Sequence, residues 1–243
     1  MGVDKPLVLA TDLDGTFLGG TVDQRSRFYQ YLRHHRQRLV LIFVTGRDLA
    51  LVRQLYSDPE FPQADYIIAD VGTTVTCGQS FTPVAAVQDW IAQTWNNSTE
   101  RVRSLLEGEP GLELQPITPQ YRVSYYYTPN KLQSDTLTRI TKAGFDYILS
   151  ADRFLDVMPR GIAKGATLLK TLESLNLSPE QTVVAGDTLN DRSLLETGLQ
   201  GIVVGNAEPK LKDIARSLPN AYISSEPGAW GIWDGLKHHG RAF

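Results

Sequence analysis

The sequence predicts an α/β protein with a doubly wound, mainly parallel core and an inserted, smaller α+β domain. Three observations lead to this fold class. In the first third of the chain, short and uniformly apolar runs alternate with segments of helical periodicity. This pattern is typical of parallel strands that helices cover on both faces. The pattern changes between about Pro83 and Pro159, and the alternation of apolar runs and helical segments then resumes.

The first third is expected to contribute three strands and two helices. Apolar runs of four to seven residues indicate the strands, and apolar residues spaced three or four apart indicate the helices. In chain order these elements are a strand at Leu7–Thr11, a helix around Phe28–Leu32, a strand at Leu39–Thr45, a helix around Leu49–Leu55 and a strand at Tyr66–Ala69.

The middle of the chain has a different pattern with antiparallel character. Trp90 and Trp95 lie in a helical stretch, and a Gly/Pro-rich turn follows at Gly108–Gly111. Tyr121–Tyr127 indicates an aromatic strand, and Leu132–Lys142 a second helix. With strand-like runs on both sides of Asp152, the pattern predicts an inserted α+β cap over residues 83–159.

The last third returns to the first pattern. A helix is expected at Ala163–Leu175, and strands at Thr182–Ala185, Ile202–Val204 and Tyr222–Ile223. We therefore expect a Rossmann-like catalytic core formed by residues 1–82 and 160–243, interrupted by the cap.

The composition is that of an ordinary globular enzyme. The 243 residues are 42% hydrophobic and 21% charged, with a formal net charge of -3. There is thus no general attraction to nucleic acid or to an anionic membrane, and no apolar run approaches the roughly 20 residues of a membrane span. The single cysteine, Cys77, has no partner for an internal disulfide. We expect a cytoplasmic protein that binds a small molecule, and a monomer, although an oligomer stays open.

Two carboxylates follow the first strand, in Asp12-Leu13-Asp14-Gly15-Thr16. Side chains alternate along an extended chain, so Asp12 and Asp14 face one side. They stand at the carboxyl end of a central strand, where open α/β sheets bind ligands. A cation would relieve their mutual repulsion, and oxygen ligands favour Mg²⁺. The structural alternative is an acidic turn at the end of a strand.

Two further positions suit a phosphate group. Thr45-Gly46-Arg47 ends the second strand and opens a helix, where a hydroxyl group and free backbone amides can bind phosphate. Lys164 begins the helix after the cap, where its charge opposes the helix dipole unless a negative ligand is bound. The structural alternatives are a threonine N-cap followed by a surface arginine, and a solvated lysine.

A second acidic group follows the strand Thr182–Ala185, in Gly186-Asp187-Thr188-Leu189-Asn190-Asp191. Asp187 and Asp191 are four residues apart, so both can approach one metal ion if the loop begins to coil. One aspartate would suffice to cap a helix. Two aspartates together with Asn190 therefore favour a functional site.

In their order along the chain, these four motifs resemble the haloacid dehalogenase-like phosphohydrolases, in the Cof-type subgroup with an α+β cap at this point. The resemblance implies that Asp12 is a nucleophile that forms an aspartyl-phosphate, and that Asp14 is the general acid and base. It further implies that the phosphate is bound by Thr45, Gly46, Lys164 and Asn190. It implies a Mg²⁺ site formed by Asp12, the backbone carbonyl of Asp14 and Asp187, with Asp191 orienting the water shell of the ion.

Four looser matches, one after the third strand and three in the cap, are similar to the sucrose-phosphatase group, which includes mannosylfructose-phosphate phosphatase. They are Val71-Gly72-Thr73, Asp89–Trp95, Arg122-Val123-Ser124-Tyr125 and Asp152–Pro159. This resemblance implies a phosphomonoesterase acting on a disaccharide phosphate such as sucrose 6-phosphate. The candidate substrate contacts are Arg47, Gly72, Thr73, Arg122, Ser124, Tyr125 and Asp152. Alternation places Arg122 and Ser124 on one face of a strand and Tyr125 on the other, so only one face can line a given cleft.

Two other functions stay open at this point. A phosphomutase of the phosphomannomutase type resembles the same subgroup, and a catalytically silent sugar-phosphate-binding protein could share the fold. The intact pair Asp12 and Asp14 argues against the silent protein. A dinucleotide-binding protein is excluded, because the acidic motif replaces the glycine-rich turn that such proteins need.

Overall fold

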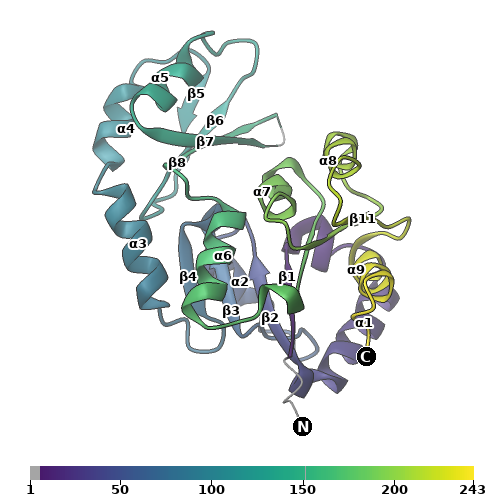
Figure 1. Cartoon of the computed structure of the whole chain (residues 1–243). Helices are drawn as coiled ribbons and strands as arrows, with labels where there is room; N and C mark the ends of the chain where they lie inside the picture. Colours follow the sequence, from purple (N-terminus) through teal and green to yellow (C-terminus); the bar gives the residue numbers. More distant parts are fainter. Residues whose placement is uncertain (1–5, 151) are drawn as a thin grey trace.

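The computed structural model describes residues 6–150 and 152–243. It contains two sheets, and the first of them is a large sheet of seven strands (Figure 1). The strand order is β11-β10-β9-β1-β2-β3-β4. All neighbours pair in parallel except β3 and β4. The strands are β1 (Leu7–Thr11), β2 (Leu39–Val44), β3 (Tyr66–Ala69), β4 (Thr74–Cys77), β9 (Thr182–Gly186), β10 (Gln200–Val203) and β11 (Ala221–Ile223).

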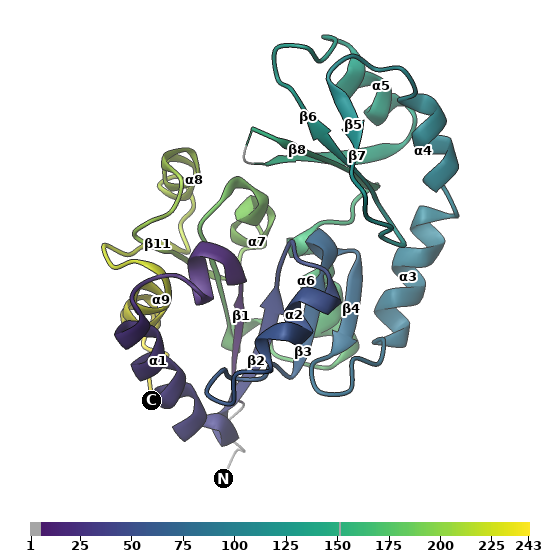
Figure 2. The ribbon, with the colours of Figure 1, turned by 180° about the vertical axis from the view of Figure 1, so that it is seen from behind.

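The central strands are apolar because helices cover both faces of this sheet. Every residue of β1 and β9 is buried. Helices α2 and α6 lie on opposite faces, as a comparison of Figures 1 and 2 shows. The helices around the first sheet are α1 (Val22–His34), α2 (Leu49–Leu55), α6 (Lys164–Ser174), α7 (Arg192–Leu195), α8 (Pro209–Ala215) and α9 (Gly228–His238). The predicted doubly wound α/β core is confirmed.

The second sheet is antiparallel and has the order β5-β6-β8-β7. Its strands are β5 (Leu112–Leu114), β6 (Val123–Tyr127), β7 (Phe145–Ser150) and β8 (Phe154–Pro159). The helices α4 (Thr99–Leu105) and α5 (Thr136–Lys142) pack against it. A hydrophobic cluster of its own includes Val102, Tyr125, Ile140 and Leu155.

Helix α3 (Ala85–Trp95) lies beside strand β4 of the first sheet and runs toward the second sheet (Figure 2). Its residues Val87 and Ile91 pack in the hydrophobic cluster of the first sheet, whereas Trp95 packs in that of the second. Since α3 belongs to both clusters, we keep the division at residues 82/83 and 159/160 as a proposal. Within the described residues, no helix combines the length and the apolar character that crossing a membrane requires.

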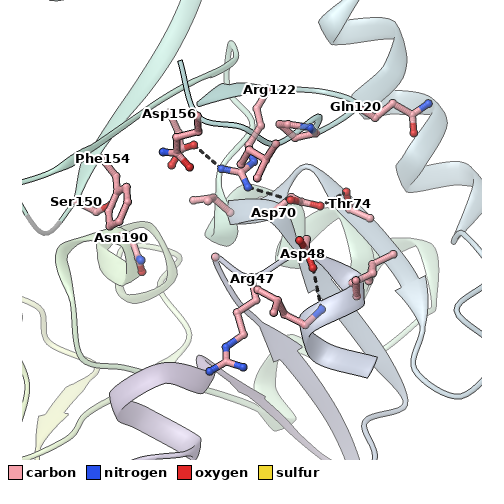
Figure 3. A pocket seen from close by; sticks show the side chains of 18 of the residues that line it. Arg47, Asp48, Asp70, Thr74, Gln120, Arg122, Ser150, Phe154, Asp156 and Asn190 are labelled. Carbon is pink, nitrogen blue, oxygen red and sulfur yellow. Dashed lines mark hydrogen bonds and ion pairs between the residues drawn. The ribbon is translucent and has the colours of Figure 1, made fainter. Parts of the chain in front are cut away.

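A cleft of about 900 Å³ opens between the two sheets (Figure 3). One wall comes from the segments that follow β2, β3 and β9, and the other from the second sheet and from residues 115–120. The carboxyl ends of β2, β3 and β9 therefore face this cleft, as expected for an open α/β sheet.

Candidate active site

The predicted polar residues converge because they follow neighbouring strands of the first sheet. Asp12 follows β1, Thr45 follows β2, and Asp187 follows β9, on either side of β1 in the strand order. The backbone N–H of Asp12 donates to the carbonyl of Ala185 at 2.9 Å, which aligns the ends of β1 and β9. Parallel strands thus bring residues 175 positions apart in the chain to one edge of the sheet.

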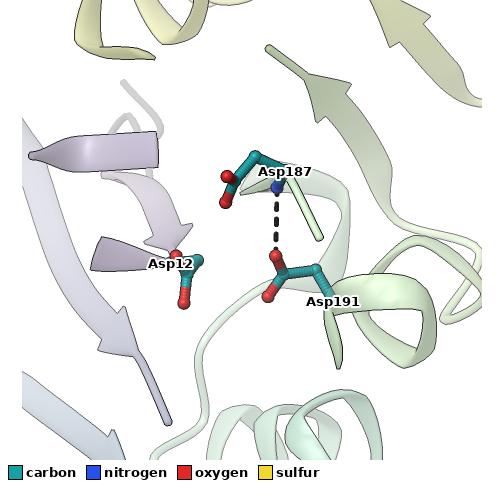
Figure 4. A group of neighbouring side chains, drawn as sticks. All are labelled: Asp12, Asp187 and Asp191. Atoms are coloured by element: carbon teal, nitrogen blue, oxygen red, sulfur yellow. Dashed lines mark hydrogen bonds between the residues drawn. The ribbon is translucent and has the colours of Figure 1, made fainter. Parts of the chain in front are cut away.

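Three carboxylates form the centre of the site (Figure 4). One oxygen each from Asp12, Asp187 and Asp191 lies within 4.8 Å of the others, and all three side chains are buried. The second oxygen of Asp191 accepts hydrogen bonds from the backbone N–H groups of Asp187 (3.0 Å) and Thr188 (3.1 Å). The loop after β9 therefore begins to coil, which is the condition for Asp187 and Asp191 to meet, and it holds Asp191 against Asp187.

Lys164 is fully buried and reaches into this cluster from the first residue of α6. Its Nζ donates to Asp12 Oδ1 at 2.7 Å, to Asp191 Oδ1 at 2.6 Å and to Asn190 Oδ1 at 2.9 Å. An ammonium group has three N–H donors, and these three acceptors use all of them. The alternative of a solvated lysine is therefore wrong.

The cluster contains more negative than positive charge. Three buried carboxylates lie together, and a single ammonium group, that of Lys164, pairs with two of them, Asp12 and Asp191. Burial raises the pKa of Asp12 well above its ordinary value, Lys164 opposes the shift, and Asp191 and Asp187 add to it. Burial also raises the pKa of Asp187 to about 7, although the hydrogen bond from Thr16 opposes this. Burial alone would lower the pKa of Lys164, but the carboxylates of Asp12 and Asp191 outweigh it and raise that pKa.

This charge imbalance fits a divalent cation. The ligand atoms that the chain offers are all oxygen, and a buried group of carboxylates is stabilised by a metal ion or by protons. The predicted Mg²⁺ site is thus chemically matched by Asp12, Asp187 and Asp191.

A glycine lets the turn after β1 approach these carboxylates. Gly15 has φ +78°, and a Cβ atom there would lie 2.1 Å from Asp187 Oδ2. The next residue, Thr16, donates its hydroxyl to Asp187 Oδ1 at 2.8 Å. Only glycine combines this left-handed backbone with such a close approach.

Asp14 points away from the cluster and pairs with Arg47. The guanidinium group donates from Nε to one oxygen of Asp14 (2.8 Å) and from Nη2 to the other (2.6 Å). The Asp14 side chain is 60% exposed. At the start of the segment that carries Arg47, the buried Thr45 accepts a hydrogen bond from the Arg47 backbone N–H at 3.1 Å.

The cleft takes in part of the predicted substrate contacts. Of the residues named from sequence, it is lined by Gly46, Arg47, Arg122 and Asn190. Arg122 is buried between Asp156 and Asp70. Burial alone would lower the pKa of Arg122, but these two carboxylates outweigh it and raise that pKa.

Other predicted contacts lie outside the cleft. Tyr125 packs in the hydrophobic cluster behind the second sheet, and Asp152 is exposed in the turn between β7 and β8. Ser124 is buried and hydrogen-bonds Asp156 and Arg122. Tyr125 and Asp152 therefore do not face the cleft, because helix packing and the hairpin turn direct them elsewhere.

Gly72 and Thr73 have structural roles instead. A Cβ atom on Gly72, where φ is +106°, would lie 2.8 Å from the backbone nitrogen of Lys164. Gly72 also accepts the hydroxyl of Thr167, and Thr73 donates its hydroxyl to the carbonyl of Asp70. The cleft is lined here by their neighbours Asp70, Val71 and Thr74.

Several cleft residues were not singled out from sequence. Glu208 holds the loop that follows β9 and carries Asp187 and Asp191. Its carboxylate accepts a hydrogen bond from the backbone N–H of Leu189 at 3.0 Å, and its own backbone N–H donates to the carbonyl of Asp187 at 2.8 Å. No motif marks Glu208, since its role depends on contacts distant in sequence. Other cleft residues that were not singled out include Asp48, Asp70, Asp156, Thr188, Gln115 and the segment 117–120. Of these, Asp156 and Thr188 lie within motifs quoted from the sequence, but no role was assigned to them.

With this geometry established, the family can be identified. A family model described as sucrose-6F-phosphate phosphohydrolase matches residues 5–240. The chain belongs to this family. The predicted resemblance to the sucrose-phosphatase group of haloacid dehalogenase-like hydrolases is thus confirmed.

Relatives of the sucrose-6F-phosphate phosphohydrolase family differ in total length. A glucosylglycerol-phosphate synthase of Pseudomonas anguilliseptica is 37% identical over 235 residues, which are 96% of this chain and 31% of that protein. The mannosylfructose-phosphate phosphatase of Agrobacterium fabrum is 29% identical, with 97% of this chain and 98% of that protein covered. A sucrose-phosphatase of Nicotiana tabacum is 29% identical and matches over 59% of its own length. The chain therefore spans less than a third of the first of these relatives and nearly all of the second.

Solved structures show the same fold. The sucrose-phosphatase of Synechocystis sp. PCC6803, in complex with sucrose and phosphate, has a TM-score of 0.87 at 23% identity and covers 96% of this chain and 98% of its own. A haloacid dehalogenase-like hydrolase of Bacillus subtilis has a TM-score of 0.70 at 20% identity and covers 99% of this chain and 94% of its own.

We expect Mg²⁺ to stabilise the protein more at pH 8 than at pH 5.5. Without metal, burial raises the pKa of Asp187 to about 7 in the folded state, well above the ordinary value of an aspartate. The metal-free fold therefore loses stability as the pH rises from the ordinary pKa of an aspartate toward 7. Above pH about 7, Asp187 is ionised in both states and causes no further loss. Mg²⁺ binds the ionised carboxylate, so it competes with protons at low pH. Calorimetry with Mg²⁺ or EDTA at both pH values measures the difference in Tm. An equal rise in Tm at both pH values would argue against a metal bound to Asp187.

Proposed function

We propose that this protein is a Mg²⁺-dependent phosphatase that hydrolyses the phosphate ester of a glycoside through a phosphorylated Asp12. The observation that carries this proposal is the position of Asp12. It lies at the end of the central strand β1, hydrogen-bonded to Lys164 and next to Asp187 and Asp191. A carboxylate held between an ammonium group and a metal site can attack a phosphoryl group whose charge both would stabilise.

The substrate class is supported by the relatives and by the size of the cleft. Sucrose phosphate, mannosylfructose phosphate and glucosylglycerol phosphate, which the names of relatives contain, are all phosphate esters of glycosides. A cleft of about 900 Å³ holds far more than a phosphate group. The family favours sucrose 6-phosphate. The relative with 37% identity favours glucosylglycerol phosphate as a second candidate.

The proposed reaction has two steps. An oxygen of Asp12 attacks phosphorus, the bond from phosphorus to the sugar oxygen breaks, and Asp14 gives that oxygen a proton. Asp14 then takes a proton from water, the water oxygen attacks phosphorus, and the Asp12 carboxylate is released. To act in these steps, Asp14 has to turn from its ion pair with Arg47 toward the cleft. With 60% of its side chain exposed, it has room to turn.

The remaining residues bind and orient. Thr45, Gly46, Lys164 and Asn190 would bind the phosphoryl oxygens, at positions where stabilising the transferred charge is the main task of the protein. Mg²⁺ would be held by Asp12, Asp187, Asp191 and the backbone carbonyl of Asp14, and it would neutralise charge on the phosphoryl group. Arg47 and the second sheet would contact the sugar and exclude bulk water.

A panel of phosphorylated glycosides tests the substrate. We expect the protein with Mg²⁺ to release free phosphate from at least one of the three named above, with a higher kcat/KM than from glucose 6-phosphate. Release of phosphate also separates a phosphatase from a phosphomutase, which returns the phosphate to a sugar. Transfer between sugars without release, or tight binding without turnover, would favour the mutase or the silent binding protein.

Ca²⁺ should not replace Mg²⁺ in this assay. The larger Ca²⁺ accepts six to eight oxygen ligands in flexible geometry, whereas Mg²⁺ requires a near-ideal octahedron. Ca²⁺ would therefore recruit the second oxygen of Asp12 and hold the nucleophile out of line. EDTA should stop phosphate release and Mg²⁺ should restore it. Equal turnover with Ca²⁺ would contradict a six-coordinate site.

A further inference from the structure

A buried ion pair joins the second sheet to the first at one end of the cleft (Figure 3). Arg122, directly before β6, donates from Nη2 to Asp70 Oδ1 at 3.0 Å, and from Nη1 to Asp156 on β8. The Arg122 side chain is 7% exposed and that of Asp70 is 13% exposed. In the part of the chain that the structure describes, this is the only ion pair that joins residues 99–159 to residues outside that range.

The guanidinium group of Arg122 is largely occupied by protein acceptors. Besides the two carboxylates, Nη1 donates to the hydroxyl of Ser124 at 2.8 Å. Its Nε is buried and has no hydrogen-bond partner among the residues that the structure describes. An arginine has five N–H donors in a fixed plane, and here three contacts fix that plane between the two sheets. Arg122 is thus placed to hold the two sheets together, and its contact with the sugar stays a prediction.

Asp70 is held as firmly as Arg122. Its second oxygen accepts the hydroxyl of Thr74 at 2.9 Å. Its backbone N–H donates to the carbonyl of Arg47 at 2.9 Å, and that of Val71 to the carbonyl of Thr45 at 3.0 Å. Asp70 and Val71 have φ of 51° and 59°, a left-handed conformation that residues other than glycine rarely adopt. The segment that receives Arg122 is therefore bonded directly to the segment that carries the proposed phosphate site.

We propose that Asp70 is a positioning residue, whose ion pair with Arg122 fixes the second sheet over the phosphate site. Together, Asp70, Arg122 and Asp156 form what we call the brace. The brace connects β6 and β8 to the Thr45–Arg47 segment, and β8 leads within five residues to Lys164. A glycoside phosphate must contact both walls of the cleft at once, so its hydrolysis depends on the brace. A small aryl phosphate needs the phosphate site alone.

A distance measurement tests the brace without any substrate. Cys77, the single native cysteine, is replaced in a Cys77→Ser background. Spin labels are then attached to cysteines introduced at two exposed positions, Glu113 on β5 and Lys210 on α8. Double electron–electron resonance then compares Asp70→Ala, Asp70→Glu and Thr74→Val with the parent. We expect Asp70→Ala to broaden the distance distribution and Asp70→Glu, which keeps the carboxylate, to restore most of it. Thr74→Val removes the other side-chain bond of Asp70, keeps the ion pair, and should resemble the parent. An unchanged distribution in Asp70→Ala would overturn the proposal.

The kinetic measurement rests on the proposed function. It compares kcat/KM for p-nitrophenyl phosphate with that for whichever of the three phosphorylated glycosides the parent hydrolyses fastest. Asp70→Ala should lower the ratio of glycoside to aryl activity on the order of tenfold, the size of a typical coupling between sites. Equal losses on both substrates would mean that Asp70 acts through its own loop. If the parent hydrolyses no glycoside phosphate, the proposed function fails, while the distance measurement still decides the brace.

Discussion

Asp12→Asn is expected to lower phosphate release at least about a thousandfold while the fold stays intact. The amide is nearly isosteric with the carboxylate, and its oxygen can still accept the hydrogen bond from Lys164 that Asp12 Oδ1 accepts at 2.7 Å. It cannot attack phosphorus. The substitution also removes one of three buried carboxylates, so in EDTA the Tm should not fall.

Two controls make this result interpretable. Intact mass must show that the new asparagine has not deamidated to aspartate, which would restore activity. Circular dichroism and Tm must show a folded protein. A well-folded variant that keeps more than about a thousandth of the parent activity would contradict the covalent mechanism.

Lys164→Met should cost both activity and stability. The ammonium group is the cation that the structure places among Asp12, Asp191 and Asn190, and it is fully buried. Removing one partner of a buried ion pair costs about 3–5 kcal/mol. For a chain of this size we expect a fall in Tm on the order of 10 °C in EDTA. Loss of a charged contact to the phosphoryl group should lower kcat by roughly a hundredfold or more.

The matched control for this variant is Lys170→Met on the same helix. Lys170 pairs with Glu173 at the surface, with 39% of its side chain exposed, and surface pairs contribute little. This variant should keep the parent activity and Tm. Added Mg²⁺ should recover part of the stability of Lys164→Met, because a cation would again offset the carboxylates. Parent-like activity in Lys164→Met would remove Lys164 from the proposed site.

The sequence predicted the arrangement of the site better than its outer parts. Apolar runs gave β1 and β3 with their observed bounds. Because parallel strands end at one edge of a sheet, the residues after β1 and β9 had to meet, and Asp12, Asp187 and Asp191 do lie together. The antiparallel strand β4 (Thr74–Cys77) was not predicted, since four residues at a sheet edge carry little periodicity.

The contacts across the cleft were harder to predict. Alternation along β6 separated Arg122 from Tyr125, but it does not say which face meets the cleft. The packing of α4 and α5 behind the sheet settles this and buries Tyr125. Asp70 carries no motif at all. Its role depends on a side chain 52 positions away in the sequence, and such contacts follow from the assembled fold.

The proposed mechanism requires a phosphoryl group that is covalently bound to Asp12. Asp14→Asn provides the most direct measurement, because without a general base the second step should slow and the intermediate should accumulate. p-Nitrophenyl phosphate is the suitable substrate, since its leaving group departs without a proton from Asp14. We predict a rapid burst of nitrophenolate close to one equivalent of enzyme, followed by slow turnover. Peptide mass spectrometry of the acid-quenched sample should then show a phosphoryl group on Asp12. Absence of both the burst and the modified peptide, in a variant whose parent turns over this substrate, would contradict the covalent mechanism.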